Sequence, residues 1–255
     1  MNVKINKEKT AIAAMFNNIA GSYDIVNHIL SFGVDKIWRN KLLKKVLKSN
    51  PKKALDIACG TGDISIALMK KGIEVTGLDI ANEMLEIAKT KTTKKYKEYK
   101  TKYSNNNKNK YLEIKPIEYV LASADSIPFP DKTFDLVTIV FGIRNFENRG
   151  EALLEIRRVL NTKGELAILE FATPHNIIWR ALYSFYFLTI LPLIGRLISG
   201  NGHAYNYLPS SVASFPQYNE FAQELEQIGY SNVCFKPLTG GVAILYTAKN
   251  YFKSD

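Results

Sequence analysis

Residues 55–63 read LDIACGTGD, a short apolar run that ends in two glycines and a carboxylate. The apolar run predicts a buried strand, and the stretch from Ile64 to Lys71 has the spacing of an amphipathic helix. Glycines at a strand-to-helix turn let the backbone bend sharply and let a ligand approach the main chain closely. A tight structural turn would use the same glycines, so this motif alone leaves both interpretations open.

Strands and helices continue to alternate along the chain. The pattern predicts seven strands (54–58, 73–79, 118–122, 134–141, 164–171, 232–236 and 242–248) and helices over 35–47, 82–91, 151–160 and 218–228. Such alternation is typical of an α/β fold with a mostly parallel sheet and helices on both faces. The short turn at 237–241 predicts that the last two strands pair antiparallel.

A chain of this length suits one domain, 1–255, better than two. Within it we distinguish three segments that are added to the alternating pattern. Residues 1–50 form a helical N-terminal cap, residues 89–115 a Lys- and Asn-rich insertion, and residues 172–216 a helical insertion on the substrate side.

The net charge of +10 is concentrated in the Lys- and Asn-rich insertion. Ten lysines and two acids lie between Lys89 and Lys115, so this stretch contributes +8 and the rest of the chain +2. Almost no apolar periodicity accompanies the charge, which predicts a solvated, partly disordered segment. Contact with anionic lipid or nucleic acid is the alternative, and of these we expect no nucleic-acid partner.

A second unusual segment, residues 177–195, is almost entirely apolar or aromatic. Its length is borderline for a membrane span, but Arg180 and Pro192 interrupt it and it lies between elements of one sheet. A span is therefore disfavoured. Core or dimer packing stays open beside a lid or groove that handles a greasy substrate at the membrane surface.

Two further strand ends carry carboxylates. Asp79 ends the second predicted strand, where a carboxylate accepts hydrogen bonds from both ribose hydroxyls of a nucleoside. Ser123-Ala124-Asp125 follows the third, where a carboxylate accepts from an adenine amino group, although a plain turn or cap is the alternative. Ser65 replaces the third glycine of a dinucleotide fingerprint, which disfavours an NAD-dependent oxidoreductase. Together the three strand ends resemble the motifs of Rossmann-like class I S-adenosylmethionine methyltransferases.

Nearly the whole sequence outside the Lys-rich insertion resembles one family, the ubiquinone/menaquinone biosynthesis C-methyltransferases. The most specific match is Phe141-Gly142-Ile143-Arg144-Asn145, directly after the fourth strand. The other matching motifs are Met15-Phe16, Ile19-Ala20, Tyr23-Asp24, Asn27, Ser31-Phe32-Gly33, Trp38-Arg39, Ile127-Pro128-Phe129-Pro130-Asp131, Phe134-Asp135, Arg157-Arg158-Val159-Leu160, Leu169-Glu170-Phe171, Leu191-Pro192-Leu193-Ile194-Gly195, Tyr205-Asn206-Tyr207-Leu208, Ser210-Ser211, Phe215-Pro216 and Leu238-Thr239-Gly240-Gly241.

The resemblance implies S-adenosylmethionine as the cofactor and C-methylation of a polyprenylated quinol ring in respiratory quinone biosynthesis. A demethylmenaquinol, a methoxylated benzoquinol on the route to ubiquinol, or both, stay open as substrates. Methyl transfer to an electron-rich ring needs alignment more than a metal. The scattered His28, His175 and His203 form no metal-ligand set, and we expect no metal.

The resemblance also implies the site residues. Arg144 would stabilise the developing phenolate, and Asn145 would orient a ring oxygen or a water, while Tyr23 and Asp24 close over the site. An ion pair that holds the loop is the alternative role for Arg144. The expected cofactor-binding residues are Asp56, Gly60, Thr61, Gly62, Asp79, Ser123, Ala124, Asp125 and Val140.

Two other functions stay open: an RNA or other small-molecule methyltransferase, and a non-catalytic quinone-binding assembly protein. Cys59 and Cys234 lie in apolar contexts far apart, and no apolar run follows the first lysines, so we expect a reducing cytoplasm and no signal peptide. A polyprenylated substrate then implies a cytoplasmic enzyme in transient peripheral contact with the inner membrane. A homodimer or an association with other quinone-biosynthesis enzymes stays open.

Overall fold

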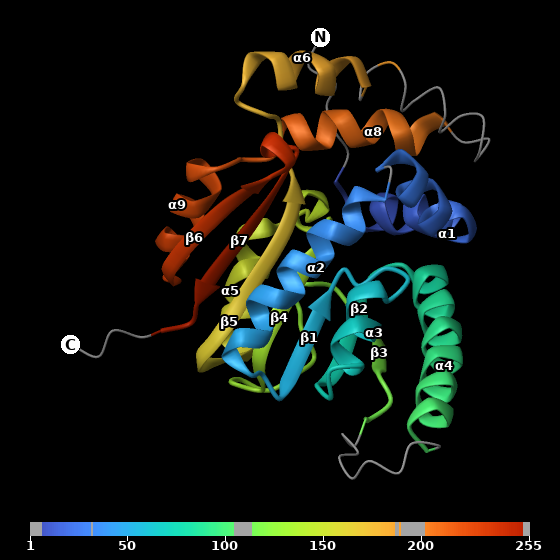
Figure 1. Ribbon diagram of the computed structural model, residues 1–255. Coiled ribbons are helices and arrows are strands. Elements are labelled where there is room, and N and C mark those ends of the chain that lie inside the picture. The colour runs from blue at the N-terminus through green and yellow to red at the C-terminus, as the bar shows by residue number, and fades with distance from the viewer. Residues whose placement is uncertain (1–6, 32, 105–113, 187–188, 190–201, 252–255) are drawn as a thin grey trace.

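A seven-stranded sheet in the order β3-β2-β1-β4-β5-β7-β6 carries the fold (Figure 1). The computed structural model describes residues 7–31, 33–104, 114–186, 189 and 202–251. The strands are β1 (Lys53–Ile57), β2 (Glu74–Asp79), β3 (Glu118–Leu121), β4 (Phe134–Val140), β5 (Leu160–Phe171), β6 (Ser231–Leu238) and β7 (Ala243–Lys249). β1 to β5 pair in parallel, and β7 runs antiparallel to both of its neighbours, β5 and β6. The predicted mostly parallel sheet with an antiparallel C-terminal strand is confirmed.

Helices cover both faces of this sheet, as the alternating pattern predicts. They are α1 (Lys9–Leu30), α2 (Val34–Val46), α3 (Asp63–Met69), α4 (Asn82–Ser104), α5 (Arg149–Val159), α6 (Ile177–Phe185), α8 (Gly202–Ala213) and α9 (Asn219–Ile228). In Figure 1, α6 and α8 lie at the top, above the carboxyl ends of the parallel strands, and α1 lies between α8 and α4. These three helices therefore surround the edge of the sheet where ligands of open α/β folds bind.

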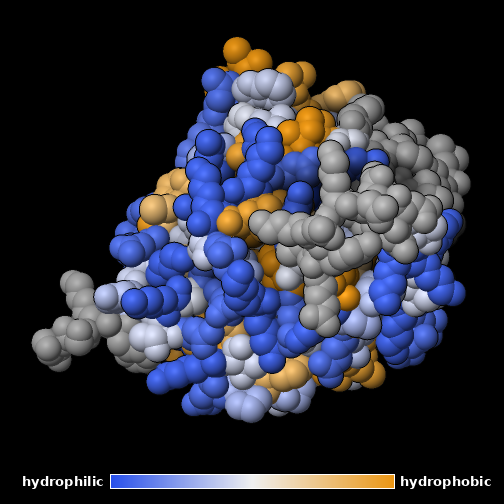
Figure 2. Space-filling model, turned by 60° about the horizontal axis from the view of Figure 1, so that its bottom comes forward, coloured by the Kyte–Doolittle hydropathy of each residue, from blue (hydrophilic) through white to orange (hydrophobic). Residues whose placement is uncertain are grey.

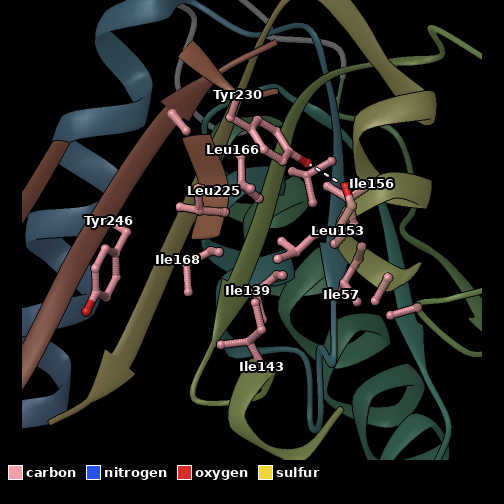
Figure 3. Close-up of a cluster of buried hydrophobic side chains, with 14 of the residues drawn as sticks. Ile57, Ile139, Ile143, Leu153, Ile156, Leu166, Ile168, Leu225, Tyr230 and Tyr246 are labelled. Carbon is pink, nitrogen blue, oxygen red and sulfur yellow. Dashed lines mark hydrogen bonds between the residues drawn. The ribbon is translucent and has the colours of Figure 1, made fainter. Parts of the chain in front are cut away.

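The two faces hold two separate hydrophobic clusters because successive strand residues point to opposite sides. One cluster joins α5 and α9 to the sheet through side chains such as Ile57, Ile139, Leu153 and Leu225 (Figure 3). The Tyr230 hydroxyl crosses this cluster and donates to the Leu153 carbonyl over 3.0 Å, drawn as a dashed line in Figure 3. A buried phenol is thus paired, as its desolvation requires.

The opposite cluster packs α2 and α3 on the sheet through Trp38, Leu42, Leu68 and Ala54, among others. A much smaller third cluster, Ile19, Ala20, Ala81 and Met84, joins α1 to α4. α1 therefore has less buried apolar contact than the helices that cover the faces of the sheet. On the face shown in Figure 2, the coloured surface is mostly hydrophilic, with hydrophobic residues in scattered groups.

The lysine-rich segment differs most from the sequence expectation. α4 does not end near Lys91 but continues to Ser104. Tyr96 and Tyr99, three positions apart on one helix face, pack against the cluster under α2 and α3, and the Tyr96 hydroxyl donates to the Ile114 carbonyl over 3.3 Å. Residues 89–104 are therefore helical, so the prediction of partial disorder is wrong for them, although many of their side chains are exposed to solvent as predicted. Residues 105–113 lie outside the described residues.

The apolar segment at 177–195 is described only in part. Its first half forms α6, and beyond Tyr186 only residue 189 belongs to the described residues. Within the described ranges, no helix is both long and apolar enough to cross a membrane.

Candidate active site

The carboxyl ends of β1, β2, β3 and β4 enclose a cavity of about 750 Å³, measured out to its open mouth. Of the predicted site residues it is lined by Tyr23, Gly60, Asp79, Ser123, Ala124, Asp125, Val140 and Asn145. A second hollow of about 330 Å³ adjoins it, lined by Tyr23, Asp56, Gly60, Thr61 and Val140 together with Arg39 and Asp63.

The glycine turn after β1 shapes the wall shared by both hollows. Gly60 and Gly62 have φ values of +55° and +82°, a region that side chains with a Cβ rarely adopt. The amide of Gly62 donates to the Cys59 carbonyl over 2.9 Å and closes the turn. Gly62 itself lines neither hollow and faces Tyr119, whose hydroxyl would lie 2.5 Å from an added Cβ. Its part in the site is therefore to start α3 in the correct direction.

Asp79 lies at the end of β2 with one backbone donor on each carboxylate oxygen. Gly60 N donates to Oδ2 over 2.8 Å, and Ala81 N donates to Oδ1 over 2.9 Å. Each oxygen keeps a second lone pair, and the side chain reaches the cavity although it is only 8% exposed. Burial raises the pKa of Asp79 above its ordinary value, partly opposed by these hydrogen bonds.

Asp125 is engaged by a residue that the sequence did not single out. The Lys9 ammonium, at the start of α1, lies 2.8 Å from Oδ1 and 2.7 Å from Oδ2. Burial acts to raise the pKa of Asp125, but the hydrogen bonds from Lys9 and Ser123 outweigh it and hold that pKa below its ordinary value. The carboxylate is therefore ionised, and one end of α1 is tied to the end of β3.

Asp24 and Thr61 belong to a polar cluster beside the glycine turn. Thr61 Oγ1 donates to Asp24 Oδ1 over 2.6 Å. Lys91 of α4 donates to Asp24 Oδ2 and Asp63 Oδ1, each over 2.7 Å, and to Thr61 Oγ1 over 3.0 Å. Neither Asp24 nor Lys91 lines the main cavity. These contacts hold the middle of α1 over the turn, so the cluster positions Tyr23 rather than meeting a ligand in the cavity directly.

Asp56 lies in β1, and its side chain is buried against one face of the sheet. Its carboxylate accepts from Ser65 Oγ over 2.6 Å and from Thr138 Oγ1 over 2.7 Å, and only 2% of the residue is exposed. Burial raises the pKa of Asp56 to about 6, partly opposed by these two hydrogen bonds. Asp56 borders the smaller hollow and not the main cavity.

Arg144 and Asn145 follow β4 in a single helical turn and face different ways. Arg144 Nη1 donates to Glu170 Oε1 and to the Phe141 carbonyl, each over 2.6 Å, and Nε donates to Ser211 Oγ over 3.3 Å. Arg144 does not line the cavity, whereas Asn145 does. The Arg144 contacts match the alternative that the sequence left open, an ion pair that holds the loop.

Several of these partners could not be found from spacing. Lys9 and Lys91 reach carboxylates 116 and 67 positions away in the chain. Glu170, the partner of Arg144, and Tyr207, whose hydroxyl donates to Asn145 Oδ1, both belong to motifs that carry the family resemblance. The resemblance was the only sequence signal for either residue. Within the described residues, no group of three or more His, Cys, Asp or Glu side chains is arranged to hold a metal ion.

Comparison with known proteins connects this geometry to a family. The model of the ubiE/COQ5 methyltransferase family matches residues 2–250. A Geotalea daltonii protein named ubiquinone/menaquinone biosynthesis C-methyltransferase UbiE is 37% identical over 249 residues, covering 96% of this chain and 99% of that protein. A Thermotoga maritima demethylmenaquinone methyltransferase is 38% identical over 243 residues, covering 94% and 96%.

Solved structures share the fold at much lower identity. The cyclase SpnF aligns with a TM-score of 0.64 at 12% identity, over 95% of this chain and 97% of that one. A SAM-dependent methyltransferase from Thermotoga maritima aligns with a TM-score of 0.60 at 14% identity, over 93% and 99%. These similarities establish a class I methyltransferase fold. The reaction has to be argued from the residues of the site.

We expect Asp56→Asn to remove a pH dependence of stability. The folded state binds the Asp56 proton more tightly than the unfolded chain, since the pKa rises from 3.8 to about 6 on folding. Its contribution to the free energy of unfolding therefore falls as pH rises from about 3 to 7, by about 3 kcal/mol in all. Chemical denaturation across that pH range should show the variant gaining this amount relative to wild type.

Asp131→Asn is the matched control, because the Asp131 side chain is 70% exposed. Its stability should follow wild type across the same pH range. Parallel stability curves for Asp56→Asn and wild type would contradict the assignment.

Proposed function

The chain belongs to the ubiE/COQ5 methyltransferase family, and we propose that it methylates a ring carbon of a polyprenylated quinol in respiratory quinone biosynthesis, with S-adenosylmethionine as methyl donor. The observation that carries the proposal is one cavity with two kinds of wall. Carboxylates at the ends of β2 and β3 line it, and so do Asn145 and residues of the N-terminal helix.

The polar groups that line the cavity suit the ribose and adenine of S-adenosylmethionine. Asp79 offers the remaining lone pairs of its carboxylate to the ribose hydroxyls, beside its backbone donors. Ser123, Ala124 and Asp125 offer a small-residue wall with one ionised carboxylate, which fits an adenine ring and its amino group. Gly60 leaves the backbone open for close approach of the remaining part of the cofactor.

The bound cofactor supplies an electrophilic methyl group, and the residues of the chain supply alignment. Transfer to a ring carbon is helped when a neighbouring ring hydroxyl loses its proton and the oxygen becomes negative. We assign Asn145 as the donor to that oxygen and Tyr23 as the ring that closes the cavity from α1. Arg144, neutralised by Glu170, supports the loop that carries Asn145.

We also propose that the protein reaches its substrate at a membrane surface through α6. Five large apolar side chains of this short helix are half to two-thirds exposed: Ile177, Ile178, Trp179, Leu182 and Phe185. A helix with an apolar outer face binds in the interfacial layer of a bilayer without spanning it. Its position beside α8, above the strand ends in Figure 1, is on the cavity side of the sheet. The cytoplasmic face of the inner membrane, where prenylquinones reside, is the surface that we propose.

Methyl transfer from labelled S-adenosylmethionine tests the reaction. We expect label in a short-tailed demethylmenaquinol, in a short-tailed methoxylated benzoquinol, or in both, when the quinols are kept reduced. Asp79→Ala should weaken cofactor binding by about 10- to 100-fold, because two ribose hydroxyls lose a charged acceptor. No label in either quinol, with cofactor binding intact, would favour an RNA methyltransferase or an assembly protein instead.

Lys9 competes with the cofactor for Asp125 in this proposal. We expect Lys9→Gln to tighten S-adenosylmethionine binding by about 2- to 5-fold, the scale of a partly exposed ion pair. Isothermal calorimetry at low salt measures the effect. Lys89→Gln is the matched control, since Lys89 pairs with Glu86 outside the cavity. Equal binding by the two variants would show that Lys9 does not compete, and weaker binding by Lys9→Gln would show that Lys9 assists the cofactor.

The α6 surface is tested by flotation with vesicles of phosphatidylethanolamine and phosphatidylglycerol. We expect the double variant Leu182→Glu, Phe185→Glu to lose most vesicle binding, because each charge must leave the apolar interfacial layer. Leu154→Glu is the control, since Leu154 is 54% exposed but belongs to α5. Equal flotation of both variants would remove α6 from the membrane contact.

A further inference from the structure

Asn145 connects the cavity to α8. Its side chain borders the cavity, and its backbone amide is fixed by a 3.0 Å hydrogen bond to the Gly142 carbonyl. On the other side, the Tyr207 hydroxyl of α8 lies 3.1 Å from Asn145 Oδ1. Only 6% of Asn145 is exposed, so its amide group has few alternatives to these neighbours. The amide atom that Tyr207 binds therefore decides whether the oxygen or the NH2 group of Asn145 faces the cavity.

Tyr207 is the donor in this contact. Burial raises the pKa of Tyr207 above its ordinary value, so the phenol stays protonated at neutral pH. A primary amide has one acceptor oxygen and one NH2 group on opposite sides of the same carbon. When Tyr207 takes the oxygen, the NH2 group must face away from α8. Among the described residues, none accepts a hydrogen bond from Asn145 Nδ2.

The neighbouring cation is held by other partners. Arg144 is buried, and its Nη1 and Nε donate to Glu170, the Phe141 carbonyl and Ser211. Ser211 also belongs to α8, so the two adjacent residues after β4 each hold one hydroxyl of that helix. α8 is therefore fixed at two points, four residues or one helical turn apart, against the loop that carries Asn145.

We propose that Tyr207 is a positioning residue for methyl transfer: its hydroxyl orients the Asn145 amide so that Nδ2 donates to the quinol oxygen next to the methylated carbon. The inference rests on the proposed function and adds the residue that sets the direction of its hydrogen-bond donor. Tyr207 touches neither cofactor nor reacting carbon and acts through Asn145. Without it, the amide is free to turn its oxygen toward the developing negative charge, which repels it.

A double-mutant cycle tests the proposal with Tyr207→Phe, Asn145→Ala and the combination. We expect Tyr207→Phe to lower kcat for the quinol by about 10-fold, the lower end for losing a supporting hydrogen bond. The dissociation constant for S-adenosylmethionine and the melting temperature should stay near wild type. In the Asn145→Ala background the same change should have no further effect on kcat, because its target is gone.

Asn145→Asp gives a second readout that a structural role would not produce. Asp keeps the acceptor for Tyr207 but offers no NH2 group to the cavity, so its kcat should fall at least as far as that of Asn145→Ala. Tyr96→Phe is the control, since its hydroxyl bonds a carbonyl near the end of α4 and not the cavity. It should leave kcat unchanged.

The outcomes separate this inference from the proposed function. A wild-type protein that methylates neither quinol overturns both. A wild-type protein that is active, with Tyr207→Phe equally active, overturns only the role of Tyr207. So does a 10-fold loss that persists in the Asn145→Ala background, since Tyr207 would then act by another route.

Discussion

The hydrogen bond from the Gly60 amide to the Asp79 carboxylate, 2.8 Å long, is the contact on which the rest of the site depends. It joins the turn after β1 to the end of the neighbouring strand β2, and it forms only because parallel strands bring both ends to one edge of the sheet. The positive φ of Gly60 aims the amide at the carboxylate. The same bond holds the buried carboxylate in place while leaving each oxygen able to accept once more. The Asp79 carboxylate thus both fixes the turn after β1 and remains available to a ligand.

The N-terminal helix is held over this site by charge as well as by apolar contact. Its apolar contacts with α4 form a small cluster, while Lys9 at one end pairs with Asp125 after β3 and Asp24 farther along pairs with Lys91 of α4. Ion pairs that are partly open to water break at lower cost than packed apolar surfaces, and salt weakens them further. The helices α2, α5 and α9, by contrast, are held by the buried clusters on the two faces of the sheet.

The sequence predicted the parts that depend on local order. Strands with glycine or carboxylate at their ends identified the sheet, the cavity edge and most of its lining, because side chains at the ends of parallel strands must converge. It did not predict the far partners of those side chains. Lys91 stood at the end of the predicted helix 82–91, among lysines that looked alike, and nothing in their spacing selects it as the partner of Asp24. The direction of Arg144 was equally hidden, since its partners Glu170 and Ser211 lie 26 and 67 positions away in the chain.

β7 has a consequence for how the chain is made. It comes after β6 in the chain but inserts between β5 and β6, so β5 has no partner on that side until residues 243–249 have left the ribosome. During synthesis, the long, mostly buried strand β5 exposes its free edge, which is the kind of edge that recruits other chains. A translation product that stops before residue 243 would contain all the strand ends that form the cofactor site, but the edge of β5 would stay unpaired. Nascent chains of this fold would then need chaperones to cover the β5 edge until the final strand, β7, has been made.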